Sequence, residues 1–267
     1  PDGKVNFFEN INANETITAI YSKAKEKASN TSKRKTLLSK INTVNIGLEF
    51  THKENEYNDF AEEILLPHKL STNGPFSVTA DVNGDSKFIR SKSKPWEVDK
   101  NSEDLGALFF DLDGDGDQDL YVTSGGSEFK KGNILLKDRI YINDGLGNFS
   151  KNNTAIPNIY ESTQTVKASD IDADGDLDLF IGTRLISGKY TFPATSYILI
   201  NEKGILKKAF EEIAPDLINI GMVTDAVFSD IDQDGDEDLL IVGEWMEIKV
   251  LENSNGIFND RSKKFGI

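Results

Sequence analysis

The sequence has 267 residues, no cysteine, two histidines and a formal net charge of −15. This length allows a sizeable core, either in one large all-β domain or in two smaller ones. The absence of cysteine excludes disulfide scaffolds and thiolate metal sites, and two histidines are too few for a zinc site. Nucleic acid is not an expected partner of so acidic a chain, and no apolar run is long enough for a transmembrane segment.

The N-terminal part of the chain differs in charge from the rest. Residues 23–40 contain seven basic residues and one acid, with several Ser, Asn and Thr. Such a composition is typical of a solvated connector, and we expect residues 23–44 to be a linker. Because the chain opens on Pro1 and has no basic and apolar leader, we also expect it to be a fragment or a processed piece.

Three nine-residue segments carry the excess acid. Residues 111–119, 170–178 and 230–238 read DLDGDGDQD, DIDADGDLD and DIDQDGDED, and they begin 59 and 60 residues apart. Their aspartates make up 15 of the 45 acidic residues, and the other 30 acids balance the 30 Lys and Arg. The acidity is therefore concentrated in three loops, whereas a solubilising surface would spread it out.

The shared pattern D-x-D-x-D-G-x-x-D predicts calcium binding, because alternating carboxylates can turn toward one ion and hard oxygen ligands suit Ca²⁺. We predict ligands from the side chains at the first, third, fifth and ninth positions and from the main chain at the seventh. The glycine permits the sharp turn. The candidate metal-site residues are Asp111, Asp113, Asp115, Asp117, Asp119, Asp170, Asp172, Asp174, Asp176, Asp178, Asp230, Asp232, Asp234, Asp236 and Asp238.

Two other kinds of acidic loop are alternatives to this calcium site. An EF-hand needs a glutamate at the twelfth loop position and flanking helices, but here that position is Val122, Ile181 or Ile241 and the flanks resemble strands. The EF-hand is therefore rejected. Solvated acidic turns without metal remain the second alternative, although three copies in the same phase favour calcium.

A fourth loop begins but does not finish. Asp81, Asn83 and Asp85 start the same pattern, after which the chain continues into Lys87 and Phe88 with no closing aspartate. Asp81 also lies only 30 residues before Asp111. We therefore predict that about 30 residues are absent after Ser86, because half a blade would leave open sheet edges and an incomplete ion shell.

Apolar strands surround the loops in a fixed order. In the first complete repeat, strands are expected at 107–110, 120–122 and 140–143. A fourth strand should follow the Gly- and Asn-rich turn that leads to Phe149, and the later repeats show the same order. Four short strands in about 60 residues are typical of a propeller blade. The predicted fold class is all-β: a partial β-propeller of four-stranded antiparallel blades, with about four repeats over residues 45–267, too few for a ring of seven.

These motifs resemble the FG-GAP or VCBS repeat propellers found in integrin α-subunit heads and in many secreted bacterial proteins. More narrowly, residues 2–4, 9–14 and 65–68 resemble the ASPIC/UnbV group related to cartilage acidic protein. The resemblance implies that residues 1–22 are the tail of a small β module preceding the propeller. It also implies an extracellular or outer-membrane surface location, for example as a lipoprotein.

The loops between second and third strands should lie on the face opposite the metal loops. Residues 124–138 and 185–195 form the longer ones, and such loops are the usual binding surface, although they can also be ordinary solvated loops. Trp96 and Trp245 are expected to pack in a core or at an edge rather than to serve as sugar platforms. The polar and aromatic residues in or beside the loops are Glu128, Phe129, Lys130, Arg184, Tyr190 and Phe192.

Two function classes follow. We expect a non-enzymatic binding or scaffolding module whose partner is a protein or glycan at the cell surface, with membrane anchoring through absent sequence. The alternative is a carbohydrate-active hydrolase or lyase built on a propeller. Catalysis would require a constellation of acid, base or nucleophile outside the metal loops, and only Glu244 beside Trp245 stands out. No catalytic residue is assigned.

Overall fold

The structure is a computed structural model that describes residues 56–61, 63–66, 69, 77–85 and 94–267. The chain divides between residues 45 and 46, and every described residue belongs to the second unit. The predicted UnbV-like tail at 1–22, the linker at 23–44 and the junction after Ser86 lie outside the described residues. Those three predictions therefore stay predictions.

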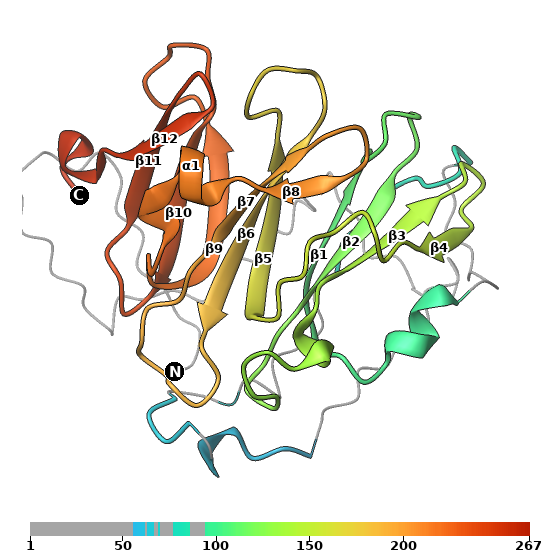
Figure 1. Ribbon diagram of the computed structural model, residues 1–267, viewed down its shortest axis with the longest axis horizontal. Helices are drawn as coiled ribbons and strands as arrows, with labels where there is room; N and C mark the ends of the chain where they lie inside the picture. The colour runs from blue at the N-terminus through green and yellow to red at the C-terminus, as the bar shows by residue number, and fades with distance from the viewer. Residues whose placement is uncertain (1–55, 62, 67–68, 70–76, 86–93) are drawn as a thin grey trace, which may run out of the picture. The chain divides into compact units, whose positions relative to one another are not determined.

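Twelve strands in the described part of the chain form three four-stranded antiparallel sheets, and each sheet follows the order of the sequence (Figure 1). This confirms the all-β class and the partial, propeller-like arrangement of blades. The first blade consists of β1 (Asp104–Phe110), β2 (Asp119–Ser124), β3 (Arg139–Asn143) and β4 (Phe149–Lys151). The second blade consists of β5 (Ser162–Ser169), β6 (Asp178–Leu185), β7 (Tyr197–Asn201) and β8 (Leu206–Lys208). The third blade consists of β9 (Met222–Ser229), β10 (Asp238–Glu244), β11 (Lys249–Ser254) and β12 (Ile257–Asp260).

Helix is confined to short turns within the described residues, as predicted. The single α-helical turn is α1, and the others are 3₁₀ turns between or beside the strands. They are α1 (Phe210–Ile213), η3 (Asp59–Ala61), η4 (Pro95–Asp99), η5 (Ile134–Leu136), η6 (Pro215–Leu217) and η7 (Ser262–Phe265).

Each acidic loop joins the first strand of its blade to the second, as predicted. The ninth aspartate opens the second strand directly opposite the last residue of the first, in the pairs Phe110 with Asp119, Ser169 with Asp178, and Ser229 with Asp238. The acidic loops lie at the upper end of the blades in Figure 1, and the loop between β6 and β7 lies at the lower end. Antiparallel pairing thus separates the two kinds of loop.

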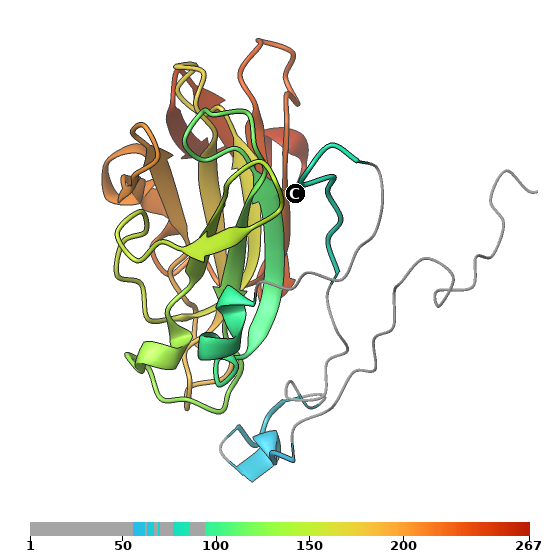
Figure 2. The same cartoon turned by 90° about the vertical axis from the view of Figure 1, so that its right-hand side faces the viewer.

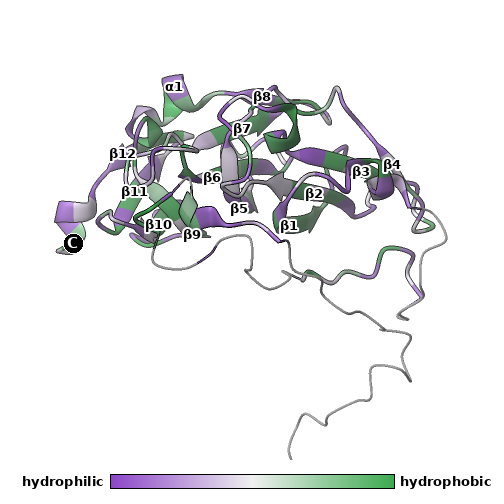
Figure 3. Cartoon of the chain, turned by 90° about the horizontal axis from the view of Figure 1, so that it is seen from below, coloured by the Kyte–Doolittle hydropathy of each residue, from purple (hydrophilic) through white to green (hydrophobic). Residues whose placement is uncertain are grey.

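The core lies between neighbouring blades, whose first strands β1, β5 and β9 contact one another in that order. Every residue of β6 is buried because the middle blade is covered on both faces, whereas β10 contains both buried and half-buried residues. Tyr121, Ile140 and Phe180 are among the fully buried side chains of this core. Figure 3 shows the hydrophobic segments concentrated in the three sheets. Burial of these apolar strands is the main force that holds the blades together.

The turn η4 lies beside β4 of the first blade (Figures 1 and 2). Trp96 packs against the rings of Tyr141 and Phe149, each with centroids 6.2 Å away. Asp99 accepts hydrogen bonds from the Tyr141 hydroxyl at 2.8 Å and from Lys151 Nζ at 2.6 Å. The expectation that Trp96 packs at an edge is confirmed.

Candidate metal centres

The three acidic loops share one backbone conformation. Their fourth position is left-handed in every copy, with φ of 77° at Gly114, 60° at Ala173 and 64° at Gln233. Left-handed backbone is strained for Ala and Gln. The rest of the loop must therefore hold these two residues in a conformation that they would not adopt on their own. The sixth position needs glycine more strictly, with φ of 91° at Gly116, 96° at Gly175 and 104° at Gly235.

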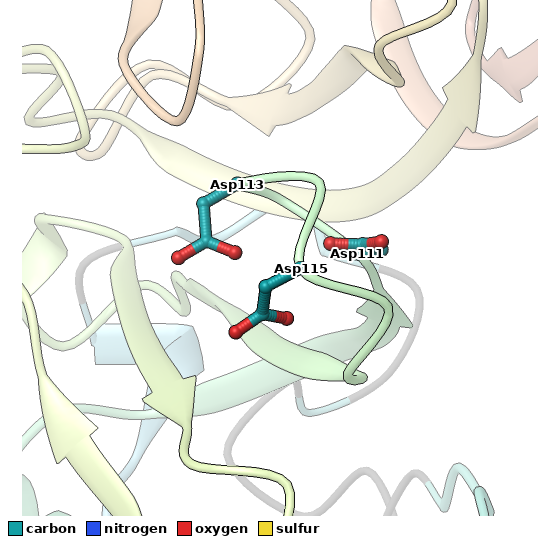
Figure 4. A group of neighbouring side chains, drawn as sticks. All are labelled: Asp111, Asp113 and Asp115. Carbon is teal, nitrogen blue, oxygen red and sulfur yellow. The ribbon is translucent and has the colours of Figure 1, made fainter.

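Three carboxylates come together in each loop, with one oxygen from each lying within 4.8 Å of the others. In the first and third loops these are the first, third and fifth positions, and in the second loop they are the first, third and ninth. Figure 4 shows the first group, with the Asp113 and Asp115 carboxylates side by side. The groups are Asp111, Asp113 and Asp115; Asp170, Asp172 and Asp178; and Asp230, Asp232 and Asp234.

The first aspartate organises its loop through main-chain amides. Asp111 accepts hydrogen bonds from the N–H groups of Gly114 and Gly116, both at 2.9 Å. Asp170 and Asp230 do the same with the fifth and sixth residues of their loops, at 3.1 and 3.2 Å. The fifth aspartate in turn accepts from the seventh N–H in all three loops. These bonds fix the carboxylates in place before any ion binds.

The ninth aspartate links the loop to the third strand. Asp178 is fully buried and accepts from the N–H groups of Ile171 at 2.9 Å and Asn201 at 2.8 Å. Asp119 and Asp238 accept the corresponding pairs of bonds. Burial raises the pKa of Asp119 and of Asp178 to about 6, although these amide bonds oppose the shift. A cation nearby would favour the ionised form.

The third aspartate of each loop has a raised pKa. Burial, followed by the charge of the fifth aspartate, raises the pKa of Asp113, of Asp172 and of Asp232. Mutual repulsion of this kind makes the ionised cluster costly without a partner, and a divalent cation would offset it. The all-oxygen donor set fits Ca²⁺, which accepts flexible carboxylate and carbonyl ligands.

The seventh aspartates lie outside the three close groups. The Asp236 side chain instead accepts a hydrogen bond from Asn255 N–H at 2.8 Å, in the hairpin between β11 and β12. Asp117 faces the equivalent hairpin of the first blade, where an added Cβ at Gly145 would come within 3.0 Å of its carboxylate. Side-chain metal binding by Asp117, Asp176 and Asp236 therefore has no geometric support from these groups, and a main-chain role at these positions stays a prediction.

Each third strand ends at or near an asparagine, as the sequence pattern indicates, but the contacts of its side chain were not predicted from that pattern. Asn201 donates its main-chain N–H to Asp178 of its own blade, and its side-chain amide donates to the Leu112 carbonyl of the preceding blade's loop at 2.8 Å. Its side-chain oxygen accepts from Gly204 N–H at 2.9 Å and closes the next hairpin. One side chain thus joins two blades at an acidic loop.

The same joint recurs in the other blades. Asn253 donates to the Ile171 carbonyl at 3.4 Å, and Asn143 donates to the Val82 carbonyl at 2.9 Å. The sequence signal is an Asn at the same phase of each repeat, three or four positions before the turn glycine whose N–H bonds to its side-chain oxygen. We call these three contacts, centred on Asn143, Asn201 and Asn253, the blade joints.

The blade joint at Asn143 connects the incomplete fourth loop, residues 81–85, to the first blade. Its partner Val82 occupies the second loop position, as Leu112 and Ile171 do in the complete loops. The Asn83 side chain also lies within hydrogen-bond distance of Asp81 and Asp85. Residues 81–85 therefore contact the first blade in the way that a complete loop contacts the blade after it.

The comparison with known families bears on the same region. A match to the FG-GAP-like repeat covers the stretch from the first acidic loop into β6. Residues 111–181 match the FG-GAP-like repeat family. Among curated proteins, none matches the chain at a significant level. The repeat supports the resemblance to FG-GAP and VCBS proteins, whereas membership of the narrower ASPIC/UnbV group stays a prediction. In the described part of the chain, no helix has both the length and the apolar character that crossing a membrane requires.

Proposed function

We propose that this chain is an extracellular, calcium-stabilised β-propeller module that binds or scaffolds a protein or glycan at the cell surface. The observation that carries the proposal is the threefold recurrence of a loop in which three carboxylates converge, with two of the three loops at a joint between blades. FG-GAP-like repeats are typical of extracellular proteins and often bind calcium, which supports both parts of the proposal. Attachment to an outer membrane, as in a lipoprotein, would come from sequence outside these residues.

Calcium is the favoured ion because the loops offer only oxygen ligands on a flexible main chain. Ca²⁺ accepts six to eight oxygens in irregular geometry, whereas Mg²⁺ requires a tighter octahedron and keeps several waters. The side chains at the first, third, fifth and ninth positions, with the seventh carbonyl, would supply that number together with water. The fourth site, at Asp81, Asn83 and Asp85, would be partial.

The alternative of a carbohydrate-active hydrolase or lyase has weaker support. Most glycosidases use two carboxyl groups flanking the scissile bond. Glu244 is the best single carboxylate outside the loops, and its two oxygens accept hydrogen bonds from Arg184 at 2.5 Å and from the Tyr190 hydroxyl at 2.9 Å. A carboxylate held in this way is better suited to orienting its neighbours than to transferring protons.

Calorimetric titration of chelator-stripped protein with CaCl₂ tests the proposal. We expect binding at three sites, weaker binding at the partial loop, and loss of one site in Asp172→Ala. The melting temperature should rise with calcium, because an ion that binds only the folded state stabilises it by mass action. Magnesium at the same concentration is the control and should give a smaller rise. Absence of both binding heat and a thermal shift would refute the calcium role.

A further inference from the structure

The exposure of Trp245 is not explained by the fold. This residue lies in the loop between β10 and β11, on the face that carries the loops between second and third strands, which we call the loop face. It follows β10 directly, its backbone is left-handed with φ of 52°, and its side chain is 75% exposed. The expectation that it packs in a core or at an edge is therefore wrong. An exposed tryptophan on a strained backbone is costly in both hydration and conformation, and such features concentrate at binding sites.

The exposed indole ring is held in one orientation by a chain of hydrogen bonds. Its Nε1–H donates to the Tyr190 hydroxyl at 3.3 Å, and that hydroxyl donates to Glu244 Oε2 at 2.9 Å. Arg184 Nη2 donates to the other Glu244 oxygen at 2.5 Å. Arg184 and Tyr190 are both buried, so the groups that support the exposed ring are themselves fixed. This support presents one ring face without a search through rotamers.

The loop that carries Tyr190 is fixed from a distant part of the chain. The buried Glu63 carboxylate accepts hydrogen bonds from the N–H groups of Gly188 and, at 3.0 Å, Tyr190. Thr191 follows with a left-handed φ of 77°, and Phe192 is exposed beside it. The loop between β6 and β7 is therefore a supported structure, unlike an ordinary solvated loop.

A cavity of about 290 Å³ lies beside the indole ring. Its lining combines an apolar part with a few polar groups of both signs, which is the usual composition of a small-ligand site. Pro193 and Met246 contribute apolar surface, while Thr191, Glu247 and Lys249 offer a hydroxyl, a carboxylate and an ammonium group.

We propose that Trp245 and this cavity bind a pyranose unit of a neutral oligosaccharide. This inference rests on the proposed binding role and names the ligand class for the loop face. The weakly polar axial face of a pyranose ring would stack on the indole face, and its hydroxyl groups would exchange hydrogen bonds with Thr191, Glu247 and Lys249. The lining has one carboxylate and one ammonium group, so it offers no excess of positive charge that would favour an acidic polysaccharide.

Two other ligand classes fit less well. A quaternary ammonium group would need several aromatic faces around it, but Tyr190 is buried and, among the residues that the structure describes, Trp245 is the one aromatic residue that lines the cavity. A protein partner would favour a broad patch with an apolar centre, whereas here a single ring borders a small hollow with charged groups in its lining.

Tryptophan fluorescence can report the site directly, because the chain contains only two tryptophans. In Trp96→Phe, an aromatic ring remains against Tyr141 and Phe149, and Trp245 becomes the single reporter. We would titrate this protein with cellohexaose, maltohexaose, mannohexaose, xylohexaose and chitohexaose, and with hexagalacturonate as the acidic comparison. We expect at least one neutral hexamer, but not hexagalacturonate, to shift the Trp245 emission and protect it from acrylamide quenching.

Calorimetry on variants with the native Trp96 separates the role of the ring from that of its support. Trp245→Ala should weaken binding by about tenfold or more, because it removes the stacking surface. Tyr190→Phe should weaken it less, because the ring remains but loses its orienting hydrogen bond. Ile257→Ala, a change at an exposed apolar residue of β12, is the matched control and should bind as the unmodified protein does.

Failure of this inference can be told apart from failure of the calcium role. All variants should keep the calcium-dependent rise in melting temperature, because none touches an acidic loop. No fluorescence response to any neutral hexamer, or undiminished binding by Trp245→Ala, would overturn the saccharide site even if calcium still stabilises the fold. A Trp245-dependent response to a proline-rich peptide alone would also overturn it and would assign the face to a protein.

Discussion

The acidic loops of the first two blades differ from that of the third in what covers them. The hairpin glycine of the following blade packs on the third aspartate of each inner loop: an added Cβ would lie 3.1 Å from Asp113 Cβ at Gly204 and 3.6 Å from Asp172 Cβ at Gly256. The blade joints add a hydrogen bond from Asn201 to the first inner loop and one from Asn253 to the second. At the outer loop, residues 230–238, Lys264 of η7 instead lies 3.5 Å from Asp232.

This difference teaches that an inner loop is part of the contact between two blades and not just a turn of its own blade. An ion in the 111–119 or 170–178 loop would stiffen carboxylates and carbonyls that the next blade also touches. An ion in the outer loop would stiffen one blade, and its site already has an ammonium group nearby. Equal sequence motifs therefore have unequal structural consequences.

The largest expected effect is the loss of calcium stabilisation in an inner loop. Asp172→Ala should remove up to about 2.7 kcal/mol of the calcium-dependent free energy of unfolding when free calcium is about one hundred times its Kd. Asp232→Ala should remove less at the same free calcium, since Lys264 lies 3.5 Å from Asp232 and weakens calcium binding at the outer loop. Thermal melts with calcium and with EDTA would measure both. Equal losses would contradict the distinction between inner and outer loops.

The next effect concerns a blade joint without reference to metal. Asn201→Ala should lower the free energy of unfolding by about 2 kcal/mol, because it leaves the Leu112 carbonyl and Gly204 N–H without their buried partner. Asn148→Ala is the matched control, since its side chain bonds only within an exposed turn, to Asp144 at 2.9 Å. Urea unfolding of both variants would decide, and a joint variant as stable as the control would show that the contact contributes little.

The strands and acidic loops could be predicted from sequence because each is a local pattern: alternation sets the strands, and the spacing of Asp and Gly sets the loop. The blade joints could not, because Asn201 meets a carbonyl 89 positions earlier in the chain. Trp245 was mispredicted for a similar reason. Its hydrophobicity suggests burial, whereas its left-handed backbone and its bond to Tyr190, 55 positions away, hold it in solvent.

A third effect is an unusual pH dependence of the calcium-free protein. The pKa values of Asp119, Asp178 and the buried Asp138 are raised from 3.8 to about 6, mainly by burial. The folded state therefore binds more protons than the unfolded state between about pH 4 and 6, and its stability falls as pH rises through this window. In EDTA, the melting temperature should be higher at pH 5 than at pH 7.5.

Calcium should weaken or reverse that trend, since the ion favours the ionised loops. The lowered pKa values of Asp144, Asp225 and Asp260 act only below about pH 4, so they do not alter the sign within the window. A melting temperature in EDTA that rises steadily from pH 5 to pH 7.5 would show that burial of these carboxyl groups does not control the stability of the calcium-free fold.

The smallest effect is expected at the outer loop. Lys264 is an exposed cation that bonds to Glu252 at 2.5 Å and approaches Asp232, so it competes with calcium for the same charge. Lys264→Ala should tighten calcium binding at this loop by less than about tenfold, and high salt should remove the difference. Lys263→Ala is the matched control. Calcium titrations at two salt concentrations would measure the affinity of both variants. Equal affinities would contradict the competition between Lys264 and calcium.

Amide hydrogen exchange with and without calcium tests the central claim most directly, because it reports loops and blade joints at the same time. On addition of EDTA, we predict faster exchange both in the inner loops at 111–119 and 170–178 and at the Gly204 and Gly256 amides, which bond to the joint asparagines of the following blades. Faster exchange confined to the acidic loops, with both glycine amides unchanged, would contradict the account that calcium holds neighbouring blades together.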